Sequence, residues 1–237
     1  MRRLRVRRFI LSGSEDLVPI LDTKGERQTL NRTIFGVDYQ LSFYRPRIER
    51  WLAVKTGVSH WRSISRDNVT TLYGCDTGSY VVDPDDASRI FQWNIRRSWD
   101  DKGNVSAWIY GLEDSAGIDL TQTHEATRTV SGRAAQTYLR TIRYGNLHPY
   151  FPDWDATAET ELPADWMFAV ALDYGDHGAS PPRIQQDRVW PVRSDSFSTY
   201  RGAFEIRTYR RVQRLLFFNN FPKSPRRGPI ASSVRSI

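Results

Sequence analysis

The feature that most constrains the fold is the alternation of large and small side chains between Asp165 and Asp176. Successive side chains of a β-strand point to opposite faces, so a period of two collects one kind of residue on one face, whereas a helix would scatter the same residues around its axis. We therefore expect a strand whose large face packs in the core. The large face carries Trp166, Phe168, Val170, Leu172 and Tyr174, and the opposite face carries Met167, Ala169, Ala171 and Asp173.

Other runs show the same alternation and are separated by short turns. Phe91 to Trp99 is expected to form one strand, with only Arg97 breaking its row of large side chains. The segment Asp100 to Asn104 has the length and the glycine of a hairpin loop that leads into a strand from Val105 to Tyr110. Further expected strands run from Tyr39 to near Pro46, from His60 to Ile64, from Val69 to Tyr73 and from Tyr138 to Arg143, with turns at Arg66–Asn68 and Tyr144–Asn146.

Longer connections interrupt this pattern. Residues Ser115 to Gln136 show no clear period, and we expect a loop with a short helix there. Loops that contain proline are expected at Phe151 to Pro163 and at Ala179 to Pro191. The sequence therefore predicts an all-β fold of antiparallel, hairpin-rich sheets with long loops and little helix.

Length and composition agree with this fold class. A chain of 237 residues fits one large all-β domain, although two smaller domains are possible. Aromatic residues make up 13% of the chain, and flat rings pack well on pleated sheets. Cys75 is the only cysteine, which excludes an internal disulfide and a cysteine-rich zinc site. No apolar run is long enough to cross a bilayer, and only Phe9 to Leu11 follow the basic start, so no signal peptide is readable.

The net charge of +7 raises the question of nucleic-acid binding, but the basic residues lie at the two ends. Residues 1–8 contribute +5 and residues 223–237 contribute +4, which leaves −2 for the body between them. We therefore expect solvated termini and no nucleic-acid partner. The predicted organisation is a basic leader at residues 1–8, a β-rich module at residues 9–222, and a disordered tail rich in Pro, Arg and Ser at residues 223–237.

Two short motifs point towards catalysis without completing a site. Asp76 to Ser79 matches the surroundings of an aspartic-protease aspartate, but that chemistry needs two carboxylates and no second copy is present. Glu159 to Glu161 and Ser196 to Tyr200 resemble pieces of toxin-type ADP-ribosyltransferases, but they occur in the reverse order. We interpret all of these segments as turns or loops, and we assign no catalytic residue.

Metal and cofactor motifs are equally incomplete. Asp83 to Asp86 and Asp173 to Asp176 could begin calcium loops, but neither continues to the terminal glutamate of an EF-hand. No glycine-rich loop that could cradle a phosphate leads into a helix. The histidines show no short ligand spacing. We assign no metal-binding or cofactor-binding residue; the histidines are His60, His124, His148 and His177.

Longer strings of residues carry more information than these short motifs. In order along the chain they are Phe9–Pro19, Tyr44–Trp51, His60–Thr70, Asp100–Asn104, Glu113–Gly117, Tyr138–Asn146, Trp190–Arg193 and Phe197–Tyr209. Taken together, they resemble the SpvB/TcdB family, the amino-terminal module of the Salmonella virulence protein SpvB and of the B components of insecticidal toxin complexes.

The resemblance implies a function without catalysis. In toxin complexes this module is a β-rich part of a hollow shell that encloses and delivers a toxic polypeptide, and in SpvB the transferase domain lies after it. The implied partners are the rest of the B-component shell, the C component and the A component. The implied location is the cytoplasm before release and the extracellular space afterwards, without membrane insertion by this segment. Because the family module normally begins upstream of Phe9, and the propeller and shell repeats are absent, we expect a truncated module.

Two alternative functions remain open at this stage. The first is a toxin enzyme, either an ADP-ribosyltransferase or a protease. The second is a carbohydrate-binding or surface-binding β module, for which Trp154 in its proline-flanked loop would be the residue to mutate.

Overall fold

The computed structural model describes residues 9–11, 17–45, 47–153, 161–178, 182–220 and 233–236. Within these residues regular structure is almost entirely strand, and α1 (Val130–Arg133), with four residues, is the only helix. The expected all-β fold is therefore confirmed, and the short helix lies inside the segment Ser115 to Gln136, as expected. No helix in the described part of the chain is long and apolar enough to span a membrane.

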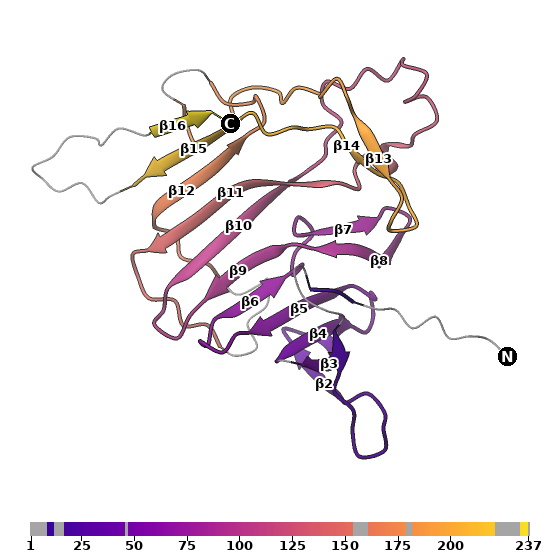
Figure 1. The fold of residues 1–237 in the computed structure, drawn as a ribbon, viewed down its shortest axis with the longest axis vertical. Helices are drawn as coiled ribbons and strands as arrows, with labels where there is room; N and C mark the ends of the chain where they lie inside the picture. The colour runs from indigo at the N-terminus through magenta and orange to yellow at the C-terminus, as the bar shows by residue number, and fades with distance from the viewer. Residues whose placement is uncertain are drawn as a thin grey trace, which may run out of the picture.

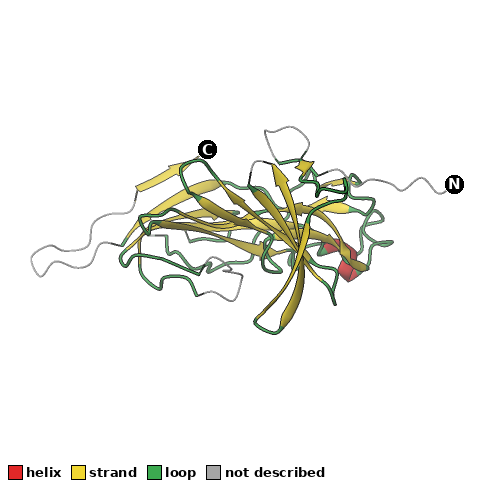
Figure 2. Ribbon diagram, turned by 90° about the horizontal axis from the view of Figure 1, so that it is seen from below, coloured by secondary structure: helices red, strands yellow, loops and turns green. Residues whose placement is uncertain are grey.

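Most strands belong to one antiparallel sheet of twelve strands, which forms a single twisted layer (Figures 1 and 2). Strands that follow each other in the chain are mostly neighbours in the sheet, because short hairpins connect them. Along the sheet the order is β1 (Val18–Pro19), β3 (Val37–Arg45), β4 (Ile48–Ala53), β5 (Ser59–Ile64), β6 (Thr70–Tyr73), β9 (Ile95–Trp99), β10 (Val105–Leu112), β11 (Thr137–Asn146), β12 (Trp166–Asp173), β15 (Arg214–Asn219) and β16 (Ser233–Ser236), with β2 (Thr29–Ile34) paired to β3.

The expected hairpin at Asp100 to Asn104 joins β9 to β10. Asp100 Oδ1 accepts hydrogen bonds from the backbone N–H groups of Lys102 and Asn104, both at 2.9 Å. Gly103 adopts a φ of +85°, in the left-handed region that favours glycine. The turn at Arg66–Asn68 likewise joins β5 to β6.

The expected single strand from Phe91 to Trp99 is wrong, because two strands in different sheets share this segment. β8 (Asp86–Trp93) pairs with β7 (Tyr80–Asp83) in a separate hairpin, whereas β9 lies in the large sheet. The break is at Asn94, whose backbone N–H donates to Ser79 O and whose carbonyl accepts from Gly74 N–H. Arg97, which the alternation marked as an interruption, is 1% exposed and donates to the Tyr150 hydroxyl at 2.9 Å.

The expected strand at Asp165 to Asp176 is present as β12, but the prediction of its core face is only half right. Trp166 and Tyr174 are buried, while the central large residues are only half-buried. The face with small side chains is buried more completely than the face with large ones: Ala169 is 2% exposed and Ala171 is 1% exposed. Ala169 lies on the same face as Ala107, where the segment after β11 packs Tyr150 against the sheet.

Two hairpins lie outside the large sheet. One is β7–β8 and the other joins β13 (Phe197–Thr199) to β14 (Ile206–Thr208); both appear to the right of the large sheet in Figure 1. Val81 of the first hairpin and Ile206 of the second belong to one buried apolar cluster with Ala135 and Phe204. This cluster joins the hairpins to each other and to Ala135, two residues after α1.

The ends of the chain only partly fall within the described residues. Phe9 packs edge-on against the ring of Trp61, with centroids 4.9 Å apart. Residues 1–8, 221–232 and 237 lie outside the described residues, so the leader and most of the tail stay predictions. Ser233–Ser236, within the expected tail, form β16 and pair with β15.

Two glycine substitutions test whether packing contacts stabilise the hairpin at residues 100–104. We expect Gly103→Ala to lower the free energy of unfolding by about 3 kcal/mol, because it combines left-handed strain with overpacking. A Cβ at Gly103 would lie 2.9 Å from both Pro149 and Phe151. Gly25→Ala is the matched control, since Gly25 has a φ of +79° but no atom within 4 Å of its Cβ position. It should cost about 1 kcal/mol. Urea unfolding measures both, and equal losses would contradict the packing argument.

Candidate functional site

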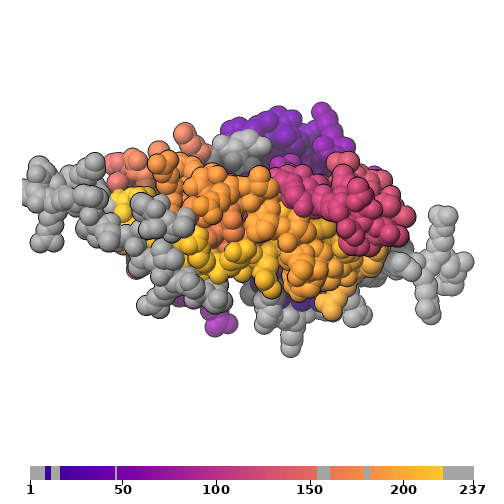
Figure 3. All heavy atoms as spheres, turned by 90° about the horizontal axis from the view of Figure 1, so that it is seen from above, coloured from indigo at the N-terminus to yellow at the C-terminus, as the bar shows by residue number. Residues whose placement is uncertain are grey.

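Buried charged side chains gather where two long segments close over one end of the large sheet. Residues 113–136 follow β10 and residues 182–213 precede β15, and Figure 3 shows them packed against each other in pink and orange. A buried charge costs free energy unless it is paired and hydrogen-bonded. We call the following residues the ion-pair network: Glu113, Glu125, Arg128, Arg140, Asp173, Asp176, His177, Glu205, Arg207, Arg210 and Arg214.

Arg210 forms the most deeply buried pair of the network. The side chains of Arg210 and Glu113 are both 0% exposed, and the guanidinium contacts both carboxylate oxygens, with Nε to Oε2 at 2.8 Å. Arg210 Nη1 also donates to Trp190 O at 2.7 Å, and the guanidinium lies 4.4 Å from the centre of the Trp190 ring. One arginine thus fastens the segment after β10 to the segment before β15.

A second group of pairs joins the same two segments near the β13–β14 hairpin. Arg207 Nε lies 3.0 Å from Glu125 Oε1, and the Tyr209 hydroxyl donates to Glu125 Oε2 at 2.7 Å. Burial and this hydrogen bond both raise the pKa of Tyr209. Arg128 donates to both carboxylate oxygens of Glu205, at 2.8 to 3.0 Å. These contacts hold the residues around α1 against the β13–β14 hairpin.

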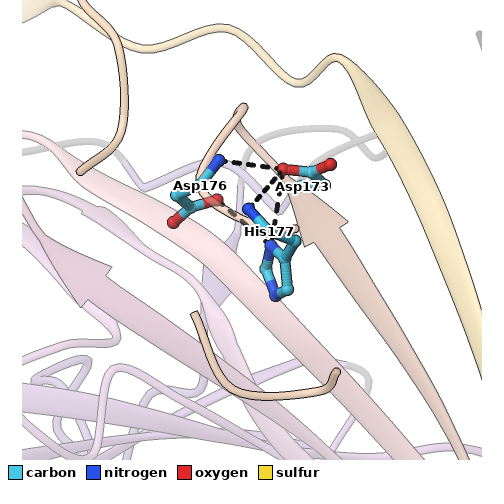
Figure 4. Close-up of side chains that lie close together, drawn as sticks. All are labelled: Asp173, Asp176 and His177. Atoms are coloured by element: carbon cyan, nitrogen blue, oxygen red, sulfur yellow. Dashed lines mark hydrogen bonds and ion pairs between the residues drawn. The ribbon is translucent and has the colours of Figure 1, made fainter. Parts of the chain in front are cut away.

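Asp173 ends β12 and organises the turn that follows (Figure 4). Its Oδ1 accepts hydrogen bonds from the backbone N–H groups of Gly175, Asp176 and His177 at 2.7, 3.0 and 3.3 Å. Its Oδ2 accepts from Arg214 Nε at 2.6 Å. Burial tends to raise the pKa of Asp173, but the backbone donors and Arg214 outweigh it, and the pKa lies below the usual value. The carboxylate is therefore held ionised by its donors.

Asp176 and His177 complete this turn. Asp176 Oδ1 accepts from the backbone N–H of Tyr174 at 3.1 Å, and Asp176 Oδ2 is bound by the guanidinium of Arg140. The two ring nitrogens of His177 both face oxygen acceptors: Nδ1 lies 3.2 Å from Asp176 Oδ1, and Nε2 lies 3.3 Å from Ile184 O.

The cluster of Asp173, Asp176 and His177 has the residue types of a metal site, and its possible ligand atoms all lie within 4.8 Å of one another. It does not fit a metal ion. The carboxylates already accept hydrogen bonds from backbone N–H groups, and each is bound by an arginine, Arg214 or Arg140. A cation placed among them would also be repelled by these two guanidinium groups. We interpret the cluster as a structural turn.

A cavity of about 320 Å³ lies beside the network. Its carboxylates are engaged: Asp114 Oδ1 accepts from Trp190 Nε1 at 2.8 Å, and Asp176 is bound by Arg140. Burial tends to raise the pKa of Asp114, but its hydrogen bonds and Arg210 keep that pKa below the usual value. No Ser, Thr, Cys, Lys or His occurs among the described residues that line it, so it presents no nucleophile paired with a base. The lining residues are Gly111, Leu112, Asp114, Ala116, Arg140, Asp176, Gln186, Arg188, Val189 and Trp190.

The protease-like motif forms a turn, as the sequence suggested. The backbone N–H and the hydroxyl of Ser79 both donate to Asp76 O at 3.0 Å, and the Asp76 carboxylate is ion-paired with Arg96. Burial raises the pKa of the neighbouring Cys75 to about 12, so its thiol is not a reactive nucleophile at neutral pH.

The transferase-like pieces do not form one site in the described residues. Ser198, in β13, donates to Glu205 Oε1 at 2.6 Å, and this glutamate is already paired with Arg128. Glu161 is exposed, whereas Glu159 lies outside the described residues, as does Trp154.

The remaining candidate metal ligands lie far apart or already make other contacts. Asp83 accepts from the backbone N–H of Asp85 at 2.9 Å and pairs with Arg89 at 2.5 Å, which is ordinary turn chemistry. His60 stacks on the ring of Trp51, with centroids 5.5 Å apart.

Sequence reasoning missed the ion-pair network, because its members lie far apart in the chain. Arg210 and Glu113 are separated by 97 positions, and no local pattern connects them. One signal was available: an Asp-x-x-Asp-His string directly after a strand places three polar side chains on one turn.

Removing the carboxylate of Asp173 tests whether the network is structural. We expect Asp173→Ala to lower the free energy of unfolding by about 3 kcal/mol, because it leaves three backbone N–H groups and Nε of Arg214 without their acceptor. The matched control is Asp195→Ala, which also removes the partner of an arginine, Arg193, but whose side chain is 62% exposed. It should leave the stability nearly unchanged. Denaturant titration gives both values, and a mild effect of Asp173→Ala would contradict the structural interpretation.

Comparison with known proteins gives relatives along most of the chain. The family described as "Salmonella virulence plasmid 65kDa B protein", SpvB, matches residues 6–221. Mono(ADP-ribosyl)transferase SpvB of Salmonella typhimurium (strain 14028s / SGSC 2262) is 32% identical over 198 residues, which is 79% of this chain and 33% of that protein. The protein of the same name from Salmonella choleraesuis matches equally well. The chain thus spans about a third of the length of the curated relatives it matches.

Among solved structures, the chain resembles one module of larger proteins. The N-terminal domain of the effector protein SpvB from Salmonella typhimurium strain LT2 superposes with a TM-score of 0.78 at 26% identity, covering 96% of this chain and 73% of that chain. TcdB2-TccC3 gives a TM-score of 0.73 at 27% identity, with 90% of this chain and 10% of that chain covered. The Photorhabdus luminescens Tc holotoxin pore gives 0.74 at 26%, with 93% and 10% covered. The chain belongs to the SpvB family and forms an SpvB/TcdB-type module.

Proposed function

We propose that this chain is a non-catalytic structural module of a bacterial insecticidal toxin complex, and that it contributes a wall to the shell that encloses a toxic polypeptide. Its partners are the remainder of the B component, the C component and the A component. The likeness to TcdB2-TccC3 and to the Tc holotoxin supports these partners. It also supports release from the cell as part of that assembly.

One observation carries the proposal: a row of large apolar side chains crosses four neighbouring strands on one face of the sheet and is only half-buried. Trp108 of β10 pairs with Ile142 of β11, Ile142 pairs with Val170 of β12, and Val170 pairs with Phe217 of β15. We call these four residues the apolar row. Paired residues of antiparallel strands lie on the same face.

Aromatic residues extend the apolar row on the same face. Tyr144 pairs with Phe168, and their rings stack with centroids 5.1 Å apart. Tyr144 remains 39% exposed. An apolar strip in the middle of a wide sheet is typical of a surface that another protein layer covers.

The opposite face shows the contrast within the same strands. Ala107, Ala171 and Leu216 are at most 1% exposed, and Ala107 packs there with Tyr150 and Trp166. The chain thus covers the small-residue face with its own segments and leaves the large-residue face half-open. A wall that contacts a neighbour on one side has this asymmetry.

The chemistry of the candidate site supports a role without catalysis. The carboxylates of the ion-pair network are bound by arginines or backbone donors, so none of them is positioned to act as a general base. The name mono(ADP-ribosyl)transferase belongs to proteins about three times as long as the part that this chain matches. The likeness is to the N-terminal domain of SpvB.

Assembly of the wall can be tested on the apolar row. When the chain is co-expressed with the C component and the rest of the B component, we expect it to co-purify with them. Val170→Lys should abolish co-purification, because a buried unpaired charge at an interface costs several kcal/mol. Val54→Lys is the control, since Val54 is 60% exposed and lies away from the row. Circular dichroism must show that both variants fold. Co-purification of a folded Val170→Lys variant at the wild-type level would show that the apolar row is not the surface that binds the other components.

The enzymatic alternative predicts turnover by the chain itself. We expect no transfer of label when the folded chain is incubated with labelled NAD and a eukaryotic cell lysate, because the site presents no free carboxylate to position the ribose and the attacking group. Full-length SpvB is the positive control. Transfer by the chain above the rate of a heat-denatured sample would overturn the non-catalytic assignment.

A further inference from the structure

The large sheet ends in two different ways at its two edges. At one edge, β2 has the sequence Thr-Leu-Asn-Arg-Thr-Ile, and its first five residues are exposed. Natural edge strands carry such polar and charged residues because unpaired backbone groups would otherwise attract another strand. β2 is therefore adapted to lie at an edge.

The strand β15, near the other edge, has the opposite character. Its sequence is Arg-Leu-Leu-Phe-Phe-Asn; Leu216 is 0% exposed, and Leu215 and Phe217 are half-buried on the other face. An apolar strand with an unpaired edge is prone to aggregation, so natural proteins usually pair or cover such an edge. β15 is therefore not adapted to be an edge strand.

The neighbour that β15 has in this chain comes from outside the family match. The match ends at residue 221, just after β15, whereas β16 begins at Ser233. β16 pairs antiparallel with β15 through Leu215 with Arg235, Leu216 with Val234 and Phe217 with Ser233. With the sequence Ser-Val-Arg-Ser, β16 has one apolar residue, so its pairing depends mainly on backbone hydrogen bonds, which any extended segment can supply.

We propose that the outer edge of β15 is a strand-binding site, which residues 233–236 fill within this chain and which accepts an extended strand from another toxin-complex component on assembly. The apolar row ends at Phe217, opposite Ser233. A strand with an apolar residue at that position would continue the row by one strand. The favoured occupant is an extended segment without proline, with apolar residues at alternate positions. This inference rests on the proposed function, because the strand comes from an assembly partner.

The test uses the full-length chain with β16 disabled by Val234→Pro/Arg235→Pro. Proline has no N–H, and successive N–H groups of a strand point in opposite directions, so one of the two substitutions removes a donor to β15. The matched control is Val234→Thr/Arg235→Lys, which keeps both N–H groups. The probe is a fluorescent synthetic peptide with the sequence of residues 231–237, together with a second peptide that carries Ser233→Val.

We expect the amides of Arg214–Asn219 to exchange with deuterium at least tenfold faster in the proline variant than in the control, and to regain protection when peptide is added. The proline variant should bind the first peptide at least tenfold more tightly than the control chain does, and the Ser233→Val peptide more tightly still. A backbone N-methylated peptide should not bind.

Unchanged exchange of β15 in the proline variant would overturn the inference, as would equal binding of the N-methylated peptide. Failure of both peptides to bind the proline variant would also overturn it. None of these measurements tests the proposed function. That function is tested by co-purification of the wild-type chain with the other components, which can succeed or fail whatever the exchange and peptide experiments show.

Discussion

A single wide sheet has two faces, and a chain of 237 residues has only its connecting segments with which to cover them. This constraint governs the rest of the structure. The face with small residues is closed by the segment after β11, where Tyr150 packs against Ala107 and Val105. The same face is closed further along by Trp190, which packs with Tyr138, opposite Gly111, and with Tyr174. The other face carries the apolar row, which is only half-buried.

The ion-pair network explains how long irregular segments can stay on the sheet. Loops have few backbone partners, so their attachment depends on side chains that reach across the sequence. Arginine suits this task, because its planar guanidinium binds a carboxylate with two hydrogen bonds and stacks on an aromatic ring, as Arg210 does with Glu113 and Trp190. Such buried pairs fix the position of a segment more than they add stability, because desolvation offsets much of the attraction.

Local chemistry determines how much of this architecture the sequence predicts. The hairpin at Asp100 to Asn104 is predictable, because an aspartate that caps the turn and a glycine at positive φ lie within five positions. The break at Asn94 is not, because its partners, Ser79 and Gly74, reach it through the fold. The period of two in β12 identifies two faces but not which of them the rest of the chain covers. The pair of Arg210 and Glu113 leaves no local trace at all.

The split between β8 and β9 also bears on how the module can vary. β6 and β9 pair directly with each other, although the β7–β8 hairpin lies between them in the chain. The hairpin is thus an excursion that departs from the sheet after β6 and returns to it at β9. Residues can be inserted into or deleted from its tip without shifting the register of any strand pair in the large sheet. Related modules are therefore free to diverge in length at this point while keeping the same wall.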